Sequence, residues 1–288
     1  MDLRKLEIFI SVAQYESFSL AAQQLHMAQP AVSIAIRKLE DELSVVLFER
    51  NNRSVHLTAE GKQALNQAKQ ILQQVSEFKH SMQSLDGKIL GELSIASPSM
   101  LATYFFPQVL GEFLSEHTGI TADIKQAGTQ KIASLILQDE VELGVVNQTH
   151  NQTGLEAIPL IQQNLVLCVS DQHALAKKKS VNVTELDALP MVLYQSDYFI
   201  RQQFDQLCQQ HQVQPDIRMQ CNFLPLLSNM VNNNFAATVA LEMMPQQEAH
   251  MCAVNLKPKM HLDMMLAWRK GRMLSRASRA FIEWLQHQ

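Results

Sequence analysis

The apolar residues between positions 18 and 57 follow two helical patterns and then a strand pattern. The spacing predicts a short helix over 19–25, capped by Ser19, and a second helix over 29–43 after a corner near 26–28. Pro30 falls in the first turn of the second helix, where its missing N–H costs no hydrogen bond. Apolar residues of this helix repeat at helical spacing, which predicts one buried stripe: Val32, Ile36, Leu39 and Leu43.

The opposite face of the second helix carries side chains that suit DNA: Gln29, Pro30, Ser33, Ile34, Arg37 and Lys38. Gln and Arg can each bond two atoms of a base edge, and cations contact phosphate. Strand-like segments follow at 47–50 and 54–57, and Asn51–Asn52 suits a tight turn between them. Arg50 and Arg53 lie near its tip, within reach of phosphate or the minor groove. The pattern predicts a winged helix-turn-helix, although two adjacent short helices in an unrelated protein can look similar.

A first helix over 3–15 supports this motif, so we expect the DNA-binding domain to span 1–58. Thr58 then caps a proline-free helix over 59–87, which we interpret as a linker and dimerisation helix. Its apolar residues alternate at spacings of four and three, as in a coiled coil: Ala64, Ala68, Ile71, Val75, Phe78, Met82 and Leu85. The alternative is that this stripe packs on the chain's own second domain.

From position 88 to 288 strand and helix patterns alternate, after a hinge at Asp86–Gly87 and Gly91. Such alternation favours parallel sheets covered by helices. We expect strands at 93–96, 121–126, 141–146, 164–170, 190–194, 217–223, 236–241 and 262–268, a helical turn at 183–186, and helices at 104–116, 130–138, 199–211, 224–232 and 275–284. Two crossings would join lobe one, 88–160 and 263–288, to lobe two, 161–262. This predicts an α/β, two-lobed, periplasmic-binding-protein-like effector-binding domain.

Residues 1–60 resemble the DNA-binding domain of LysR-type transcriptional regulators, through Leu3–Phe9, SFSLAAQQLHMAQPAVSIAIRKLEDEL, LFER and LTAEG. GELSIASPS and DEVELGVV resemble the effector domain of the same family. The resemblance implies a bacterial regulator that binds an inverted-repeat operator as a homodimer or homotetramer, with Gln29, Pro30, Ser33, Arg37 and Arg53 at the DNA. Three features depart from the family pattern: Ala28 replaces Ser or Thr, Ile34 replaces a polar residue, and VNNNFAATVALEMM lacks glycines.

The expected effector site lies beyond the carboxyl ends of the strands, where helices start. Ser97 and Ser99 flank Pro98 at such a point, and an ordinary serine cap is the alternative. The full set of candidates for contact with the effector is Ser97, Ser99, Gly128, Thr129, Asn147, Tyr194, Ser196, Arg201 and Phe223. For Arg201 a plain surface arginine is the alternative. We expect a small organic anion as the effector, because helix starts favour negative charge and the family resemblance implies the same.

Composition narrows the classes of function. The chain has 288 residues, of which 47% are hydrophobic and 18% charged, with a formal net charge of −4. Residues 1–58 carry six Lys and Arg against seven Asp and Glu, a net −1, which argues against a protein that coats DNA non-specifically. No apolar run is long enough to span a membrane, and the N-terminus has no signal-peptide pattern, so we expect a cytoplasmic protein.

The sequence contains no clear motif for metal binding or catalysis. The four cysteines form no CxxC pair, the histidines show no metal-binding spacing, and no GxSxG or phosphate-loop motif is present, so we expect no cofactor, no metal and no enzymatic activity. Cys208 and Cys221 share faces with apolar residues and are read as core residues. Two alternatives stay open: a constitutive DNA-binding regulator with a vestigial cleft, and a thiol-based redox sensor that uses this pair.

Overall fold

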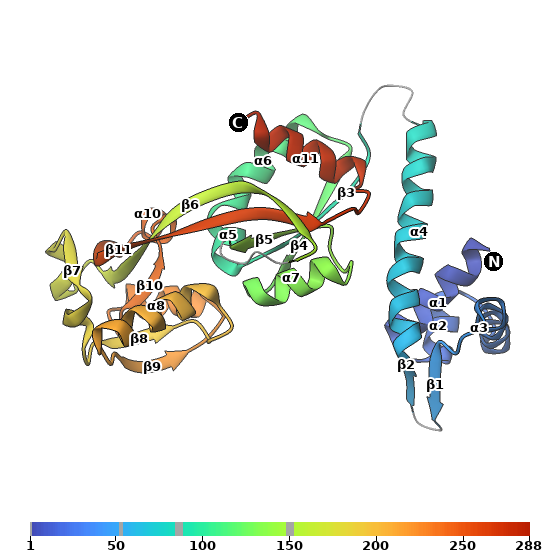
Figure 1. The fold of residues 1–288 in the computed structure, drawn as a ribbon, viewed down its shortest axis with the longest axis horizontal. Helices are drawn as coiled ribbons and strands as arrows, with labels where there is room; N and C mark the ends of the chain where they lie inside the picture. Colours follow the sequence, from blue (N-terminus) through green and yellow to red (C-terminus); the bar gives the residue numbers. More distant parts are fainter. Residues whose placement is uncertain (1, 52–53, 84–88, 148–152) are drawn as a thin grey trace. The chain divides into compact units, whose positions relative to one another are not determined.

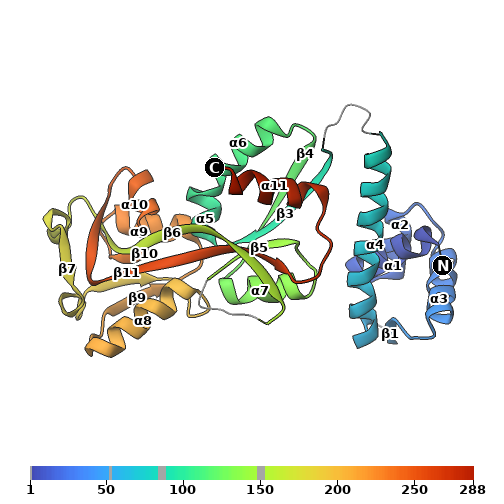
Figure 2. The same ribbon diagram turned by 45° about the horizontal axis from the view of Figure 1, so that its top comes forward.

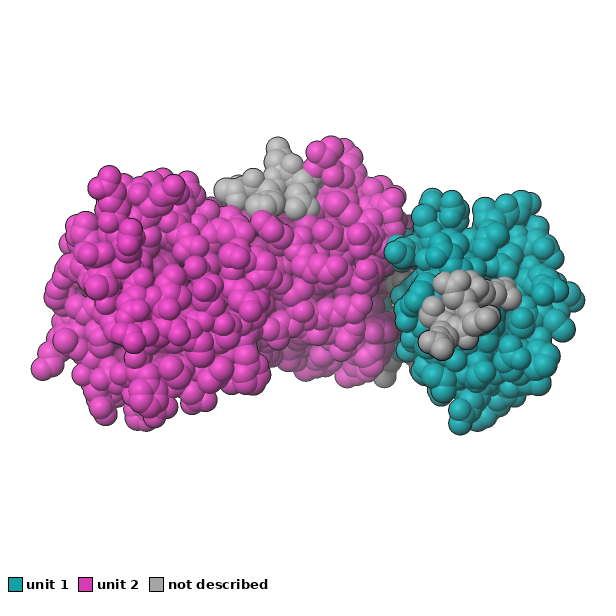
Figure 3. All heavy atoms as spheres, turned by 90° about the horizontal axis from the view of Figure 1, so that it is seen from below, with its two compact units in different colours: residues 1–90 teal, residues 91–288 magenta. Residues whose placement is uncertain are grey.

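The computed structural model describes residues 2–51, 54–83, 89–147 and 153–288. The chain divides into two compact units, Met1–Leu90 and Gly91–Gln288, which Figure 3 shows in separate colours. In the described ranges no helix has both the length and the apolar character needed to cross a membrane. The hinge residues Asp86–Gly87 and the turn residue Asn52 lie outside the described residues, as do Arg53 and Leu85.

The first unit is a helix-turn-helix followed by a hairpin and a long helix (Figure 1). Its elements are α1 (Leu3–Tyr15), α2 (Phe18–Gln24), α3 (Gln29–Leu43), β1 (Phe48–Asn51), β2 (Ser54–Leu57) and α4 (Ala59–Gln83). The two strands pair antiparallel, with Phe48 opposite Leu57. The core gathers apolar side chains from the helices and the hairpin, among them Leu6, Phe9, Val12, Ala21, Val32, Ile36, Leu39, Leu47 and Phe48. The predicted helix-turn-helix and wing are therefore present.

Two details of the helix pair differ from the sequence-based expectation. Ser17, not Ser19, caps α2, because its hydroxyl accepts a hydrogen bond from the Leu20 N–H at 3.3 Å. Helix α3 begins after Ala28 with no side-chain cap and carries Pro30 in its first turn. Leu43, expected in the buried stripe, is 39% exposed, because the last turn of α3 extends past the core that buries Leu39.

Helix α4 starts as predicted, since the Thr58 hydroxyl accepts the Gly61 N–H at 2.9 Å. A Cβ built on Gly61 would lie 2.1 Å from the Leu47 carbonyl oxygen, so only glycine allows α4 to approach the start of the wing this closely. The expected dimer seam needs a correction in its first half. Ala64, Ala68 and Ile71 pack against the core of their own unit, because α4 lies along α1.

The second unit is built around one seven-stranded sheet with the order β10-β6-β11-β5-β3-β4, and β7 pairs with β11. Its strands are β3 (Gly91–Ser97), β4 (Ile120–Gln126), β5 (Leu143–Asn147), β6 (Leu155–Ser170), β7 (Ser180–Asn182), β10 (Thr238–Leu241) and β11 (Met251–Arg269). The antiparallel strands β6 and β11 run side by side through both lobes (Figures 1 and 2). They are the two predicted crossings, and they make the sheet mixed rather than purely parallel.

Lobe one carries α5 (Ser99–Tyr104), α6 (Phe106–Glu116), α7 (Thr129–Leu137) and α11 (Arg276–Gln286). The helix expected over 104–116 is present as α6, but it starts at Phe106, and the short helix α5 before it was not expected. The chain forms two helices that break at Phe105, because Pro107 in the first turn of α6 cannot donate a hydrogen bond back into α5. This extra helix places Ser99 at a helix start, directly after the buried end of β3.

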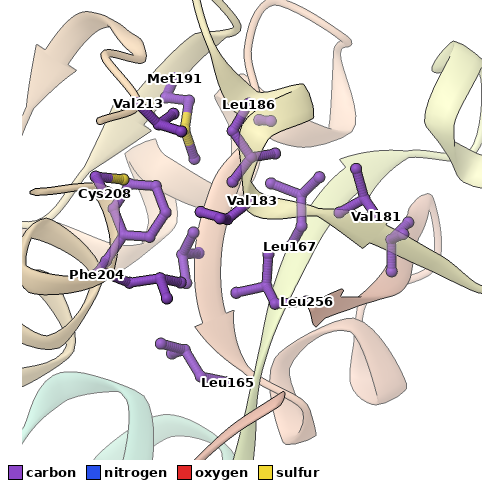
Figure 4. Packing of buried hydrophobic residues seen from close by; sticks show 14 of the residues in the cluster. Leu165, Leu167, Val181, Val183, Leu186, Met191, Phe204, Cys208, Val213 and Leu256 are labelled. Carbon is purple, nitrogen blue, oxygen red and sulfur yellow. The ribbon is translucent and has the colours of Figure 1, made fainter. Parts of the chain in front are cut away.

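Lobe two contains a second sheet, β8 (Pro190–Leu193) with β9 (Asp216–Gln220), which are parallel. Around it lie the 3₁₀ turns η1 (Ala174–Lys177) and η2 (Val183–Leu186) and the helices α8 (Phe199–His211), α9 (Leu224–Asn232) and α10 (Met243–Gln247). Figure 4 shows the core of this lobe, where Phe204 and Cys208 of α8 face Met191 and Val213. In the glycine-poor turn after α9, Asn234 adopts φ 57°, a left-handed conformation that Asn tolerates.

Candidate DNA-reading helix and effector pocket

The outer face of α3 carries the side chains expected at DNA. Gln29, Pro30 and Ile34 are exposed, Ser33 is half-buried, and Val32, Ile36 and Leu39 on the other face are buried. Arg37 and Lys38 are exposed, and neither forms an ion pair with any residue that the structure describes. By contrast, Arg4 and Lys5 of α1 pair with Glu7 and Glu42. The cations of α3 are therefore free to meet phosphate.

The wing is tied to α3 by a residue that the sequence analysis did not single out. The Glu40 carboxylate on α3 accepts hydrogen bonds from the backbone N–H groups of Leu47 at 2.9 Å and Phe48 at 3.3 Å. This contact sets where β1 begins relative to the reading helix. The side chain of Arg50, near the end of β1, is not described, and Arg53 lies outside the described residues.

A pocket lies between the two lobes of the second unit. Its free volume is about 20 Å³, room for about one water molecule, within an envelope of about 350 Å³ that includes open solvent. Lobe one contributes the start of α5, Thr129 and Asn147, and lobe two contributes Tyr194 and the start of α8. The complete lining is Pro98, Ser99, Met100, Leu101, Thr129, Asn147, Tyr194, Tyr198, Phe199, Ile200, Leu241, Leu262 and Met264. Ligand pockets are commonly of this kind, apolar with a few polar groups.

The side chain of Asn147, which lines the pocket, has an amide nitrogen without a hydrogen-bond acceptor among the described residues. Asn147 ends β5, is 4% exposed, and its Nδ2 forms no hydrogen bond within the described part of the chain. A buried amide without an acceptor is unfavourable by roughly 1–3 kcal/mol. A ligand oxygen at Nδ2 would remove this penalty.

A hydrogen bond between two side chains crosses the pocket from lobe to lobe. The Ser99 hydroxyl on α5 lies 3.2 Å from the Tyr194 hydroxyl, and both side chains are buried. Burial raises the pKa of Tyr194 above its ordinary value, so its hydroxyl stays protonated. The Tyr194 ring stacks on Tyr198, with centroids 4.7 Å apart and an interplanar angle of 14°. This aromatic pair forms a flat wall on the lobe-two side.

Four of the nine sequence-predicted effector residues line the pocket: Ser99, Thr129, Asn147 and Tyr194. The other five lie elsewhere. Ser97 is buried and donates to the Pro98 carbonyl, Ser196 is exposed, and Phe223 is exposed at the start of α9. Gly128 precedes α7, where a Cβ would lie 3.2 Å from the Asp197 carbonyl oxygen.

Arg201 is neither a pocket residue nor a surface arginine. Its side chain is 9% exposed and pairs with Asp205 at 2.7 Å, while Nη1 donates to the Tyr194 carbonyl and to Gln220, each at 2.9 Å. It therefore joins the ends of β8 and β9 to α8 and fixes the backbone of Tyr194. The sequence holds a signal for this role, because Asp205 stands four residues further along the same helix.

The apolar pocket residues were missed: Met100, Leu101, Phe199, Ile200, Leu241, Leu262 and Met264. Their patterns match those of ordinary core residues, and only the position of Phe199 and Ile200 at a predicted helix start was a usable signal. No group of His, Cys, Asp or Glu in the described ranges is arranged to hold a metal ion.

The cysteines are free thiols, and those of the lobe-two interior are poorly suited to redox chemistry. Cys208 packs in the lobe-two core, and burial, aided by the nearby Asp205 charge, raises the pKa of its thiol to about 11. Burial also raises the pKa of Cys168. Reactive cysteines have lowered pKa values, because the thiolate is the nucleophile.

Comparison with known proteins identifies both domains. The family described as "Bacterial regulatory helix-turn-helix protein, lysR family" matches residues 3–62, and "LysR substrate binding domain" matches residues 86–288. The uncharacterized HTH-type transcriptional regulator YwbI of Bacillus subtilis is 29% identical over 292 residues, covering 100% of this chain and 95% of that protein.

Solved structures share the fold at low sequence identity. The full-length regulator CbnR in complex with its target DNA gives a TM-score of 0.72 at 21% identity, covering 100% of this chain and 99% of that one. The effector-binding domain of QuiR in complex with shikimate gives a TM-score of 0.61 at 20% identity, covering 69% of this chain and 96% of that one. With an N-terminal helix-turn-helix and a two-lobed effector-binding domain that both match family profiles, the chain belongs to the LysR family of DNA-binding transcriptional regulators.

Proposed function

We propose that this chain binds an inverted-repeat operator through α3 and the wing as a homodimer or homotetramer, and that a small organic molecule in the inter-lobe pocket modulates this binding. The observation that carries the proposal is the pocket itself. It is lined by both lobes and contains a buried, unpartnered amide at Asn147. A molecule bound there touches both lobes at once, so its binding energy acts on their relative arrangement.

DNA recognition is supported by the two-sided character of α3. Its inner face is anchored in the core, so the helix is rigidly presented, while Ser33 and Arg37 lie on the outer face. Ile34, 55% exposed, could contact a thymine methyl group. Two structural neighbours whose names state a ligand, CbnR with DNA and QuiR with shikimate, are consistent with both halves of the proposal.

The test of the DNA half is binding of the purified full-length protein to fragments of its own upstream intergenic DNA across a salt series. We expect protection of an inverted repeat. The Ser33→Ala/Arg37→Ala double variant should lose about 10- to 100-fold in affinity for that site and show a shallower salt slope. The matched control, Ser115→Ala/Arg218→Ala, removes the same side-chain types from exposed positions of the second unit and should bind as wild type.

The outcome against this assignment is equally specific. If the double variant protects the same site with the same affinity and salt slope as wild type, α3 is not the reading helix. If no fragment is bound selectively, the operator is not upstream of the gene, and the search extends to genomic fragments.

The test of the effector half is thermal stabilisation of the full-length protein by a metabolite panel, followed by DNA binding with each hit. A pocket ligand should raise the melting temperature of wild type but not of Asn147→Leu, and it should shift operator affinity or the length of the protected site. A panel without hits, and without any effect on DNA binding, would favour a constitutive regulator with a vestigial cleft.

A further inference from the structure

We infer that the inter-lobe pocket selects an uncharged, largely apolar molecule that offers one oxygen acceptor to Asn147, and that the Asp197 carboxylate excludes anions from it. The inference rests on the proposed function, because it names the chemical class of the molecule that occupies the same pocket. It replaces the anionic effector expected from the sequence alone.

Among the residues that the structure describes, the wall of the pocket offers no charged partner. None of the thirteen lining residues is Lys, Arg, His, Asp or Glu. A carboxylate entering this wall would lose its hydration without gaining a cation, which is strongly unfavourable. Arg201 directly follows the lining residue Ile200 in sequence, but its Nε pairs with Asp205, and its Nη1 donates to Gln220 and to the Tyr194 carbonyl.

The start of α7, one of the helix starts beside the pocket, already faces a carboxylate. Helix starts attract anions through their free N–H groups. Gly128 immediately precedes α7, and a Cβ built on it would lie 3.3 Å from Oδ2 of Asp197 and 3.2 Å from its carbonyl oxygen. Asn222 lies beside this carboxylate, with its Nδ2 3.5 Å from Oδ1. A second carboxylate at Thr129, the first residue of α7, would therefore meet a like charge from lobe two.

The groups that remain define the preferred molecule. Asn147 presents an Nδ2 donor, which calls for a carbonyl, amide or hydroxyl oxygen. Tyr194 and Tyr198 present a stacked aromatic wall, and Met100, Leu241 and Met264 complete an apolar enclosure. A flat ring bearing a neutral oxygen matches the chemistry of all these groups, and the lobes must move apart to admit it, because the free volume is about 20 Å³.

The experiment compares benzamide with benzoate, which have nearly the same shape but differ in charge, by calorimetric titration of the full-length protein. We expect benzamide to bind at least about tenfold more tightly than benzoate. In Asp197→Asn this preference should shrink by about threefold but not vanish, because the repelling charge is gone while the apolar wall still offers no cation. Asp171→Asn removes another exposed carboxylate from lobe two and should keep the wild-type preference. Asn147→Leu should weaken benzamide about tenfold, and its melting curve checks that it folds.

The possible outcomes separate the charge preference, the role of Asp197 and the use of the pocket. Benzoate binding as tightly as benzamide, with both lost in Asn147→Leu, overturns the charge preference but leaves the pocket as the effector site. An unchanged preference in Asp197→Asn overturns the role given to Asp197. Binding of neither compound to wild type at the highest soluble concentration also overturns the inference, while the metabolite panel still judges the proposed function separately.

Discussion

Tyr104→Phe is the sharpest test of how the two lobes are held together. Tyr104 ends α5 in lobe one, and its hydroxyl donates to Oε1 of Glu248 in lobe two at 2.6 Å. Asn232 donates to the other oxygen of Glu248 at 3.0 Å, and the Gln247 amide donates to the Tyr104 carbonyl at 2.9 Å. The substitution removes the one phenolic hydrogen bond and keeps the ring, the Asn232 contact and the backbone contact.

The expected magnitude follows from the kind of bond removed. A hydrogen bond to a charged acceptor contributes about 1.5–3 kcal/mol, and partial solvent access to Glu248 reduces this to about 1–2 kcal/mol. For a unit of this size, about 1 kcal/mol lowers the melting temperature by roughly 2–4 °C. Scanning calorimetry should therefore show the transition of the second unit about 2–8 °C lower in Tyr104→Phe. Tyr15→Phe in the first unit is the control that should leave this transition unchanged.

The dependence of stability on pH tests the contact between Tyr104 and Glu248 independently. Burial by itself raises the pKa of Glu248, but hydrogen bonds from Tyr104, Asn232 and Ser228 outweigh it and hold the pKa below 4.5. A carboxyl whose folded pKa is lowered stabilises the fold above its unfolded pKa, and this contribution is lost as the pH falls through the folded pKa. Wild type should therefore lose more stability than Tyr104→Phe as the pH falls below about 4.5. Equal melting temperatures at neutral pH and equal acid sensitivity would refute the reasoning.

Two further predictions address positioning and assembly. Arg201→Met should lower the free energy of unfolding by about 2–3 kcal/mol in urea titrations, because the Tyr194 carbonyl loses its buried donor, and it should also weaken pocket ligands; an unchanged urea midpoint would contradict this. Val75→Asp, in the second half of α4, should shift the protein from dimer to monomer in sedimentation velocity, whereas Lys69→Ser should not; a dimer that persists in Val75→Asp would place the interface elsewhere.

The sequence predicts elements well where one residue pattern runs through a whole element. Helices α8 and α9 have the bounds expected, because their apolar spacing and their flanking residues agree. The sequence predicts the lengths of β6 and β11 poorly, because it indicates strands only at 164–170 and 262–268. Only the second half of β6 is buried, and its first half carries polar residues and Pro159, so a strand that crosses from lobe to lobe shows a strand pattern at one end only.

Some residues of the pocket could be predicted from the sequence and others could not. Ser99, Thr129 and Asn147 were predictable because small polar residues at the carboxyl ends of strands are uncommon in a core and converge in space. Leu241 and Met264 were not, since an apolar residue that faces a ligand has the same sequence signature as one that faces another core side chain. The charge preference could not be predicted either, because it depends on Asp197 lying beside Gly128 across the lobe boundary.

Helix α5 explains why residues outside the pocket can govern what binds in it. This short helix belongs to lobe one, yet lobe two contacts it along its length. Ser99 lies at hydrogen-bond distance from Tyr194, the Met100 sulfur accepts the Leu241 N–H at 3.2 Å, and Tyr104 donates to Glu248. The first two contacts border the pocket and the third does not. A ligand that inserts between Ser99 and Tyr194 must therefore act on the same lobe interface that Tyr104 stabilises. Such coupling is reciprocal. Tyr104→Phe should therefore change the affinity for the ligand, and the ligand should change by the same factor the effect that Tyr104→Phe has on the equilibrium of lobe closure.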